Sequence, residues 1–315
     1  MGKGKVLVLD SVHPDMIARL SDLGYECEVI AMDYPELLAG ISAYTGLVIR
    51  SRCAVDKPVI DAAVRLKFIA RVGAGMENID TLYARQKGIA CLNSPEGNAD
   101  AVGEYVIGSL LALFRHTVQA DIQVRRGEWQ RKSNTGLELN SKTVGIIGYG
   151  NMGHSVAKKL SGFGCKVLVY DKYKQNYGDA YAEQVSLETL RQQADIVSVH
   201  INYMPENHYY INGSFIHDFK KQIYIVNTSR GKVLNTSDLA EALSEGKVSG
   251  AVLDVLEYED IRLQNAPKEQ WDEAMQKLAQ NANVILSPHI AGQTYESQIK
   301  HVKVLAEKIK QLSLE

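Results

Sequence analysis

The sequence predicts an α/β protein built from two doubly wound parallel sheets with helices on both faces. Short apolar segments alternate with amphipathic segments along nearly all of the 315 residues. The apolar segments are continuous rather than alternating, as is typical of strands buried on both faces. This pattern restarts after a long apolar helical segment near residue 99, so one series of βαβ units follows another.

The first series lies before residue 98. The segment Pro14–Leu23 has helical spacing of apolar side chains and is followed by Gly24, which suits a helix C-cap. We expect strands at Lys5–Leu9, Glu28–Ile30, Leu47–Ile49 and Phe68–Ala70. The parallel sheet that these strands imply needs the intervening helices as crossovers.

The second series begins at Thr143, after two helices predicted over Ala99–Arg115 and Val118–Gly127. A helix is expected at Ser155–Phe163, and a last amphipathic helix at Thr294–Leu312. The predicted strands are Val144–Ile147, Lys166–Tyr170, Ile196–His200, Ile223–Asn227, Gly250–Leu253 and Val284–Leu286. A run of six such strands fits a doubly wound, dinucleotide-binding domain.

Composition excludes several classes of function. The formal net charge is −2, so neither nucleic acid nor a membrane surface is an expected partner. Cys27, Cys53, Cys91 and Cys165 have no metal-ligand spacing, and no metal site is expected. The N-terminus lacks the apolar core of a signal peptide, and no apolar segment approaches the roughly 20 residues that span a bilayer. We therefore expect a cytoplasmic location.

A glycine-rich turn separates a predicted strand from a predicted helix at Gly148-x-Gly150-x-x-Gly153. Gly148 permits the tight turn, Gly150 lets a pyrophosphate approach, and Gly153 allows close helix–strand packing. Asp171 ends the next strand, where a carboxylate can bind both ribose hydroxyls and repel a 2′-phosphate. The pattern favours NAD over NADP; the alternative is a tight turn beside a surface aspartate.

Three polar groups follow the ends of later strands: Arg230, Glu259 and His289. Because the carboxyl ends of parallel strands form the ligand crevice, we expect these groups to meet there. A histidine can take the hydroxyl proton of a 2-hydroxy acid, a glutamate can orient the imidazole, and an arginine can bind the carboxylate. Taken singly, each has a bland alternative, namely a capping arginine, a solvated glutamate or a loop histidine.

At these motifs the chain resembles the D-isomer-specific 2-hydroxyacid dehydrogenases. The similar segments are Arg71–Asp80, Asn98–Glu104, the glycine turn, Asn227–Gly231, Asp254–Val255 and His289–Gly292. The resemblance is strongest to the phosphoglycerate dehydrogenase branch of the family, which implies a role in serine biosynthesis. Because the chain ends at Glu315, we expect a short form without a C-terminal regulatory domain.

The resemblance implies where the ligands bind. Arg230, Glu259 and His289 would be catalytic, and the backbone N–H groups of Ala74 and Gly75 would hold the substrate carboxylate. The implied NAD-binding residues are Gly148, Gly150, Asn151, Met152, Gly153, Asp171, Thr228, Asp254, His289 and Gly292. The implied substrate-binding residues are Arg50, Arg52, Arg71, Ala74, Gly75, Asn98 and Arg230.

The resemblance also implies a discontinuous domain order. Residues 1–97 and 288–315 would form a flavodoxin-like substrate domain, into which a Rossmann-like NAD domain of residues 98–287 is inserted. Helices at about 98–140 would form a homodimer contact.

Two features depart from the family pattern. The catalytic Glu259 is followed by Asp260 where the family usually has proline, and Glu257 is a competing carboxylate. The polar stretch 261–280 is expected to be a surface loop with one helix, Lys268–Gln280.

The choice of acid depends on Arg50, Arg52 and Arg71, which are expected to form a phosphate pocket for 3-phosphoglycerate or 3-phosphohydroxypyruvate. The segment Trp129–Lys132 resembles one that reaches the neighbouring subunit's site. The alternatives are solvated arginines and an enzyme for glyoxylate, hydroxypyruvate or another D-2-hydroxy acid. An NAD-binding regulatory protein without turnover is the alternative from a different class.

Overall fold

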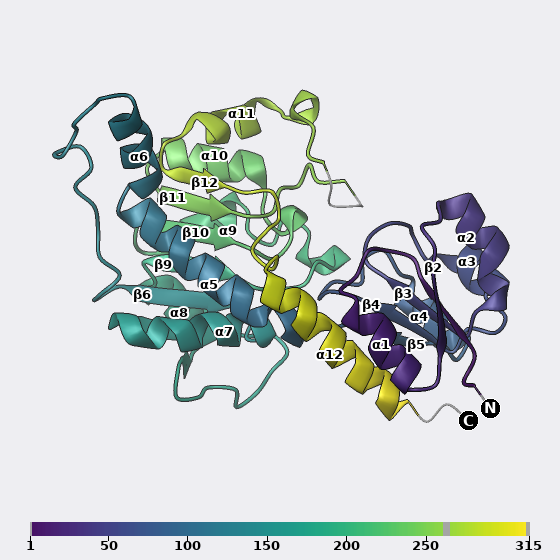
Figure 1. Ribbon diagram of the computed structural model, residues 1–315. Helices are drawn as coiled ribbons and strands as arrows, with labels where there is room; N and C mark the ends of the chain where they lie inside the picture. The colour runs from purple at the N-terminus through teal and green to yellow at the C-terminus, as the bar shows by residue number, and fades with distance from the viewer. Residues whose placement is uncertain (1, 261–264, 313–315) are drawn as a thin grey trace. The chain divides into compact units, whose positions relative to one another are not determined.

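The computed structural model describes residues 2–260 and 265–312, and these divide into two compact units. The first unit comprises the described residues up to Ala99, Asp260, and those from Gln293 onward. The second unit comprises Asp100–Glu259 and Asn265–Gly292. Figure 1 shows a separate sheet with its own helices in each unit.

The first unit is a five-stranded parallel sheet in the order β2-β1-β3-β4-β5, the order of flavodoxin-like folds. Its strands are β1 (Lys5–Val8), β2 (Glu26–Val29), β3 (Gly46–Ile49), β4 (Phe68–Arg71) and β5 (Ala90–Leu92). The helices are α1 (Asp15–Asp22), α2 (Tyr34–Gly40), α3 (Lys57–Ala62), α4 (Thr81–Gln86) and α12 (Tyr295–Gln311). Helices α1 and α12 share one core cluster with the sheet, whereas α2, α3 and α4 share the other.

The second unit is a seven-stranded parallel sheet in the order β12-β11-β10-β9-β6-β7-β8. The strands are β6 (Thr143–Ile147), β7 (Lys166–Tyr170), β8 (Glu183–Gln184), β9 (Ile196–Val199), β10 (Ile223–Asn227), β11 (Val248–Leu253) and β12 (Val284–Leu286). The chain winds outward from β6 in both directions, so the strand order reverses between β6 and β9. A dinucleotide binds at such a reversal in Rossmann folds.

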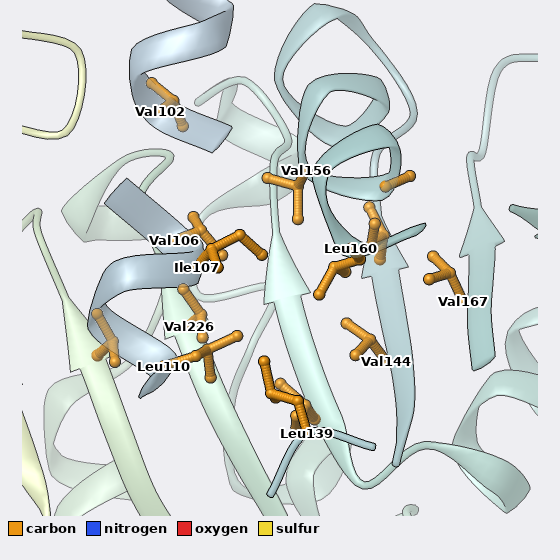
Figure 2. Packing of buried hydrophobic residues seen from close by; sticks show 14 of the residues in the cluster. Val102, Val106, Ile107, Leu110, Leu139, Val144, Val156, Leu160, Val167 and Val226 are labelled. Carbon is orange, nitrogen blue, oxygen red and sulfur yellow. The ribbon is translucent and has the colours of Figure 1, made fainter. Parts of the chain in front are cut away.

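Helices cover both faces of the second sheet. On one face, α5 (Pro95–Phe114) and α7 (Asn151–Leu160) bury apolar side chains against the strands. Figure 2 shows Val106 and Leu110 of α5 and Leu160 of α7 in this cluster. The other face carries α8 (Leu187–Gln193), α9 (Gly213–His217), α10 (Thr236–Ser244) and α11 (Glu273–Gln280). The predicted α/β class with two parallel sheets is thus confirmed.

Several predicted boundaries were wrong. Helix α7 begins at Asn151 rather than Ser155, because Gly150 is its N-cap residue and the helix follows the glycine turn directly. The helix predicted over Lys268–Gln280 is a 3₁₀ turn at Lys268–Gln270 followed by α11, whose N-cap Asp272 accepts a hydrogen bond from the Met275 N–H. Residues 261–264 of the predicted loop lie outside the described residues.

Helix α6 (Thr117–Arg125) contrasts with the other helices because it buries none of its own residues. Its apolar side chains Val118, Ile122 and Val124 are 55%, 44% and 53% exposed. Across residues 2–260 and 265–312, no helix is long and apolar enough to cross a membrane.

Candidate active site

The glycine turn needs each of its three glycines for a different steric reason. Gly148 has a φ of +90°, and a Cβ on it would lie 2.6 Å from the carbonyl oxygen of His200 at the end of β9. A Cβ on Gly153 would overlap the carbonyl oxygen of Gly148, so α7 packs directly against the turn. A Cβ on Gly150, in contrast, would meet no described atom within 4 Å. Open space therefore lies in front of Gly150.

This open space fits the pyrophosphate of NAD. Within the described chain, no side chain caps the first turn of α7, so the N–H groups at Asn151 and Met152 face the turn with the positive end of the helix dipole. Thr228, at the end of β10, has a buried hydroxyl with no hydrogen-bond partner among the described residues. A buried unpartnered hydroxyl is stabilised by a ligand that pairs with it. These residues would hold the cofactor.

The Asp171 carboxylate is fixed at the end of β7. Its Oδ2 accepts a hydrogen bond from the Tyr149 N–H at 2.9 Å, so it ties the glycine turn to the next strand. Its Oδ1 accepts from the N–H groups of Tyr173 and Lys174 at 3.0 and 3.2 Å. A carboxylate has about four lone pairs, so acceptor capacity remains for ribose hydroxyls. The sequence did not reveal this clamp, because it depends on the conformation of the loop after Asp171.

Glu259 and His289 form a hydrogen-bonded pair. Glu259 Oε2 lies 2.8 Å from His289 Nδ1, and the two side chains are 15% and 23% exposed. The other carboxylate oxygen accepts the Leu256 N–H at 2.6 Å, which fixes the carboxylate. His289 has a φ of +55°, and its N–H donates to the carbonyl of Asp254 at 2.7 Å. Because Nδ1 faces the glutamate, Nε2 is the ring atom left for a substrate proton.

The competing carboxylate of Glu257 has a different place. No hydrogen bond joins it to His289 among the described residues, and its Oε2 is buried without a hydrogen-bond partner there. Glu259 is therefore the carboxylate that orients the imidazole.

Arg230 lies in the loop after β10, and this loop packs tightly against the loop that carries Glu259. The Asn227 side chain closes the Arg230 loop, because its Nδ2 donates to the Arg230 carbonyl at 3.0 Å and its Oδ1 accepts from the Ser229 N–H and hydroxyl. A Cβ on Gly231 would overlap the carbonyl group of Leu256. The missing side chain at Gly231 thus lets the two loops touch backbone to backbone.

Asp254 is only 1% exposed and fastens the His289 loop to the end of β11. Its carboxylate accepts hydrogen bonds from the Ser287 hydroxyl and from the N–H groups of Ile290 and Ala291, at 2.5, 2.8 and 2.8 Å. Ser287 also pairs with the hydroxyl of Tyr105 on α5. Tyr105 was not predicted as a site residue; its one signal in the sequence is a hydroxyl within an apolar helical segment. Gly292, expected in the NAD site, follows directly after this loop.

The first unit carries the remaining predicted residues at the ends of adjacent strands. Register pairs Ile49 of β3 with Arg71 of β4, so Arg50 follows the strand next to Arg71. The Asp10 carboxylate at the end of β1 accepts the Arg50 N–H at 2.5 Å and lies 3.6 Å from Arg52 Nε. Arg52 is thus partly neutralised, whereas no described carboxylate forms an ion pair with Arg50.

Side chains of Asn93 and Arg71 contact the loop that is expected to bind the substrate carboxylate. The Asn93 amide donates to the Ala74 carbonyl at 2.6 Å, and the Arg71 guanidinium lies where a Cβ on Gly73 would stand. Gly75 follows Ala74 in this loop. Asn98, in the first turn of α5, has a buried Oδ1 without a partner among the described residues. Nowhere in the described parts are three His, Cys, Asp or Glu side chains grouped so as to hold a metal ion.

The strand order, the glycine turn and the Glu259–His289 pair define a class of protein, the dehydrogenases that use a dinucleotide. The family model of the NAD-binding domain of D-isomer-specific 2-hydroxyacid dehydrogenases matches residues 107–291. The chain belongs to this family of NAD-dependent oxidoreductases.

Similar proteins match nearly the whole chain. It is 36% identical to a hydroxypyruvate reductase of Thermotoga maritima, over 96% of this chain and 94% of that protein. It is 35% identical to a D-3-phosphoglycerate dehydrogenase of Archaeoglobus fulgidus, over 97% of this chain and 56% of that protein. The chain thus spans little more than half of this longer relative.

Solved structures give the same assignment. A D-lactate dehydrogenase of Aquifex aeolicus, in complex with NAD and lactic acid, superposes with a TM-score of 0.82 at 28% identity, over 97% of this chain and 94% of that one. A D-2-hydroxyisocaproate dehydrogenase superposes with a TM-score of 0.81 at 27% identity, over 96% and 94% of the two chains. The similar proteins thus act on different acids.

Proposed function

We propose that this chain interconverts D-3-phosphoglycerate and 3-phosphohydroxypyruvate with NAD, the step that would serve serine biosynthesis. The observation that carries the chemistry is the 2.8 Å hydrogen bond between Glu259 and His289. The loop that carries Glu259 packs against the loop that carries Arg230, at Leu256 and Gly231. The observation that favours a phosphorylated acid is Arg50, which follows the strand beside Arg71 and whose guanidinium forms no ion pair with a carboxylate within the described chain.

Each residue has a distinct part in the proposed reaction. NAD, when bound at the glycine turn, supplies the nicotinamide that exchanges a hydride with carbon 2 of the acid. His289 Nε2 takes the hydroxyl proton in oxidation and returns it in reduction. Glu259 holds the ring so that Nε2 faces the substrate and stabilises the imidazolium that forms. Arg230 binds the carboxylate and the carbonyl oxygen, and the N–H groups of Ala74 and Gly75 also hold the carboxylate.

Arg50, Arg52 and Arg71 are not equivalent. The guanidinium of Arg52 lies near the Asp10 carboxylate, so it should attract a second anion less strongly than an unpaired guanidinium would. Arg50 and Arg71 stand at neighbouring strand ends, where a planar, permanently charged group suits a phosphate. We therefore assign the phosphate mainly to Arg50 and Arg71.

A second candidate is the reduction of an unphosphorylated acid, hydroxypyruvate or glyoxylate. It is favoured by the Asp10–Arg52 pair, which leaves less free positive charge than a phosphate pocket with three open arginines. The Thermotoga maritima hydroxypyruvate reductase and a 34% identical glyoxylate reductase of Thermofilum pendens carry these activities in their names.

A substrate panel separates the two candidates. NADH consumption should be followed with 3-phosphohydroxypyruvate, hydroxypyruvate, glyoxylate, pyruvate and 2-oxoglutarate. The proposal expects the highest kcat/KM with the phosphorylated acid. A higher value with hydroxypyruvate or glyoxylate would support the second candidate, and no turnover with any acid would overturn both.

We also infer that the chain forms a homodimer through α6 and the segment after it. Helix α6 buries nothing in its own unit, and Trp129 beyond it is 77% exposed. Large exposed apolar groups gathered on one helix mark an interface. Sedimentation equilibrium should give twice the mass of one chain, whereas a monomer at micromolar concentration would contradict the dimer.

A further inference from the structure

A buried histidine of the C-terminal helix contacts a serine far away in the sequence. His301 of α12 is 7% exposed, and its Nδ1 lies 2.8 Å from the hydroxyl and 2.9 Å from the carbonyl oxygen of Ser94. A carbonyl oxygen only accepts, so Nδ1 carries the proton and donates to it. Both residues belong to the first unit.

Ser94 in turn fixes the loop expected to bind the substrate carboxylate. Its hydroxyl accepts the Gly73 N–H at 3.2 Å, and its own N–H donates to the Gly73 carbonyl at 2.9 Å. The neighbouring Asn93 holds the Ala74 carbonyl at 2.6 Å. The backbone of Gly73 and Ala74 is thus hydrogen-bonded to two consecutive residues, Asn93 and Ser94. His301 in turn is hydrogen-bonded to Ser94.

The imidazole has little freedom to move. A Cβ on Gly97, in the first turn of α5, would overlap the His301 ring. Further along the same helix α12, Lys308 donates to the Asn93 carbonyl at 2.9 Å and to the Glu96 carboxylate at 3.0 Å. Helix α12 therefore fastens the segment behind the loop at two points, and His301 is the one that reaches Ser94.

We propose that His301 is a positioning residue for substrate binding, which acts through Ser94 to aim the N–H groups at Ala74 and Gly75 toward the acid's carboxylate. The proposal rests on the function proposed above, because it takes this loop as the carboxylate site. A displacement of about 1 Å in a group that orients a substrate weakens its contribution strongly. Binding of the acid should therefore depend on the Nδ1 donor of His301.

The charges around His301 explain why an uncharged donor suits this place. Burial lowers the pKa of His301 to about 4, the hydrogen bond to Ser94 opposes this shift, Arg50 and Arg71 lower the pKa further, and Glu96 raises it. At neutral pH the ring is uncharged. It can therefore hold Ser94 without adding a charge next to the two arginines assigned to the anion.

The test compares His301→Leu, which removes the donor, with His301→Asn, whose amide nitrogen can replace Nδ1. Leu305→Ala is the matched control, since Leu305 is fully buried in the same helix and belongs to an apolar core cluster. With hydroxypyruvate as the probe, the leucine variant should raise KM about tenfold, with kcat and NADH affinity within about twofold of wild type. The asparagine variant should restore KM, and Leu305→Ala should lower Tm without raising KM.

Two results would overturn the proposal: an unchanged KM in His301→Leu, or an equal rise in Leu305→Ala. Amide hydrogen exchange at residues 73–75 gives a readout that needs no turnover, and it should be faster in the leucine variant than in the other two. If wild-type protein turns over no 2-oxo acid, the proposed function fails. In that case the amide hydrogen-exchange rates at residues 73–75 test the positioning role by themselves. Equal rates in all variants would overturn it.

Discussion

The carboxylate of Glu259 bridges His289 and the backbone of its own loop, with one oxygen 2.8 Å from the imidazole Nδ1 and the other 2.6 Å from the Leu256 nitrogen. The pair is therefore held by contacts within the chain itself. Such pre-organisation is what a general base needs in order to face a reacting hydroxyl in a single orientation.

Replacing Glu259 with Gln should remove the charge that stabilises the imidazolium while keeping the size of the side chain. We expect kcat/KM for the 2-oxo acid to fall about 10²-fold, the lower range for loss of acid–base assistance. Glu257→Gln is the matched control, because Glu257 does not pair with His289, and it should stay within a few-fold of wild type. Steady-state NADH assays that ranked the two variants the other way would contradict the assignment.

Replacing Gly150 with Ala should impair NADH binding without unfolding the protein. The new methyl group would point into space with no described atom within 4 Å, where we place the pyrophosphate. Gly162→Ala is the control, since a Cβ there also meets nothing within 4 Å. Fluorescence titration should show NADH affinity lowered about tenfold or more for Gly150→Ala alone, with both Tm values near wild type. Equal affinities would place the phosphates elsewhere.

Replacing Asp171 with Ala should weaken the preference for NADH over NADPH. The carboxylate would no longer repel a 2′-phosphate or accept from the ribose, so the ratio of the two kcat/KM values should fall at least about tenfold. Part of the loss with NADH would come from the freed Tyr149 N–H in the glycine turn. An unchanged cofactor ratio would show that Asp171 is a loop clamp only.

Replacing Arg50 with Ala should affect a phosphorylated substrate far more than an unphosphorylated one. Loss of a charge-assisted contact to phosphate should raise KM for 3-phosphohydroxypyruvate about tenfold or more, with a smaller change for hydroxypyruvate. Arg52→Ala is the comparison, and its effect should be weaker because Arg52 already lies near Asp10. Equal changes in KM for both acids would count against a phosphate pocket.

The depressed pKa of His301 should make stability depend on pH. Its pKa is about 4 in the folded chain, first because of burial, against an ordinary value of 6.5. The unfolded chain therefore binds the proton first as the pH falls. The contribution is fully present above pH 6.5 and is lost as the pH drops toward 4, by at most about 1.4 kcal/mol per pH unit.

Urea denaturation at pH 7 and pH 5 measures this loss. His301→Asn should lose less free energy of unfolding between the two pH values than wild type does, because asparagine does not titrate. The exposed His208→Asn variant should behave like wild type. An identical pH dependence in wild type and His301→Asn would show that His301 does not titrate in this range.

The fold was largely predictable because strands buried on both faces have continuous apolar sequences. Two strands escaped prediction. Strand β8 has two residues, Glu183 and Gln184, and both are exposed. Strand β5 (Ala90–Leu92) is apolar, but it has only three residues and none of them is β-branched or aromatic. Their pairing is imposed by neighbouring strands, which the local sequence does not reveal.

The positions of candidate residues were predictable where they follow the end of a strand, as Asp171 follows β7 and Arg230 follows β10. Contacts between distant residues were not. Tyr105 and Ser287 are separated by 182 residues, and Ser94 and His301 by 207. No spacing rule links such pairs, because only the tertiary fold brings them together. The Asp171 clamp escaped prediction for a different reason, since it depends on the local conformation of residues 172–174.

The tight packing of Gly231 against Leu256 limits which sequence changes the two loops tolerate during evolution. The backbone of the Arg230 loop lies directly against the backbone of the Glu259 loop. A mutation that displaces one loop should therefore displace the other, so we expect few substitutions in either loop to be tolerated. The arginines at the ends of β3 and β4 belong to the other unit, whose strands have their own core. Under the proposed function, substitutions at these arginines would change which acid is accepted without displacing the Arg230 and Glu259 loops.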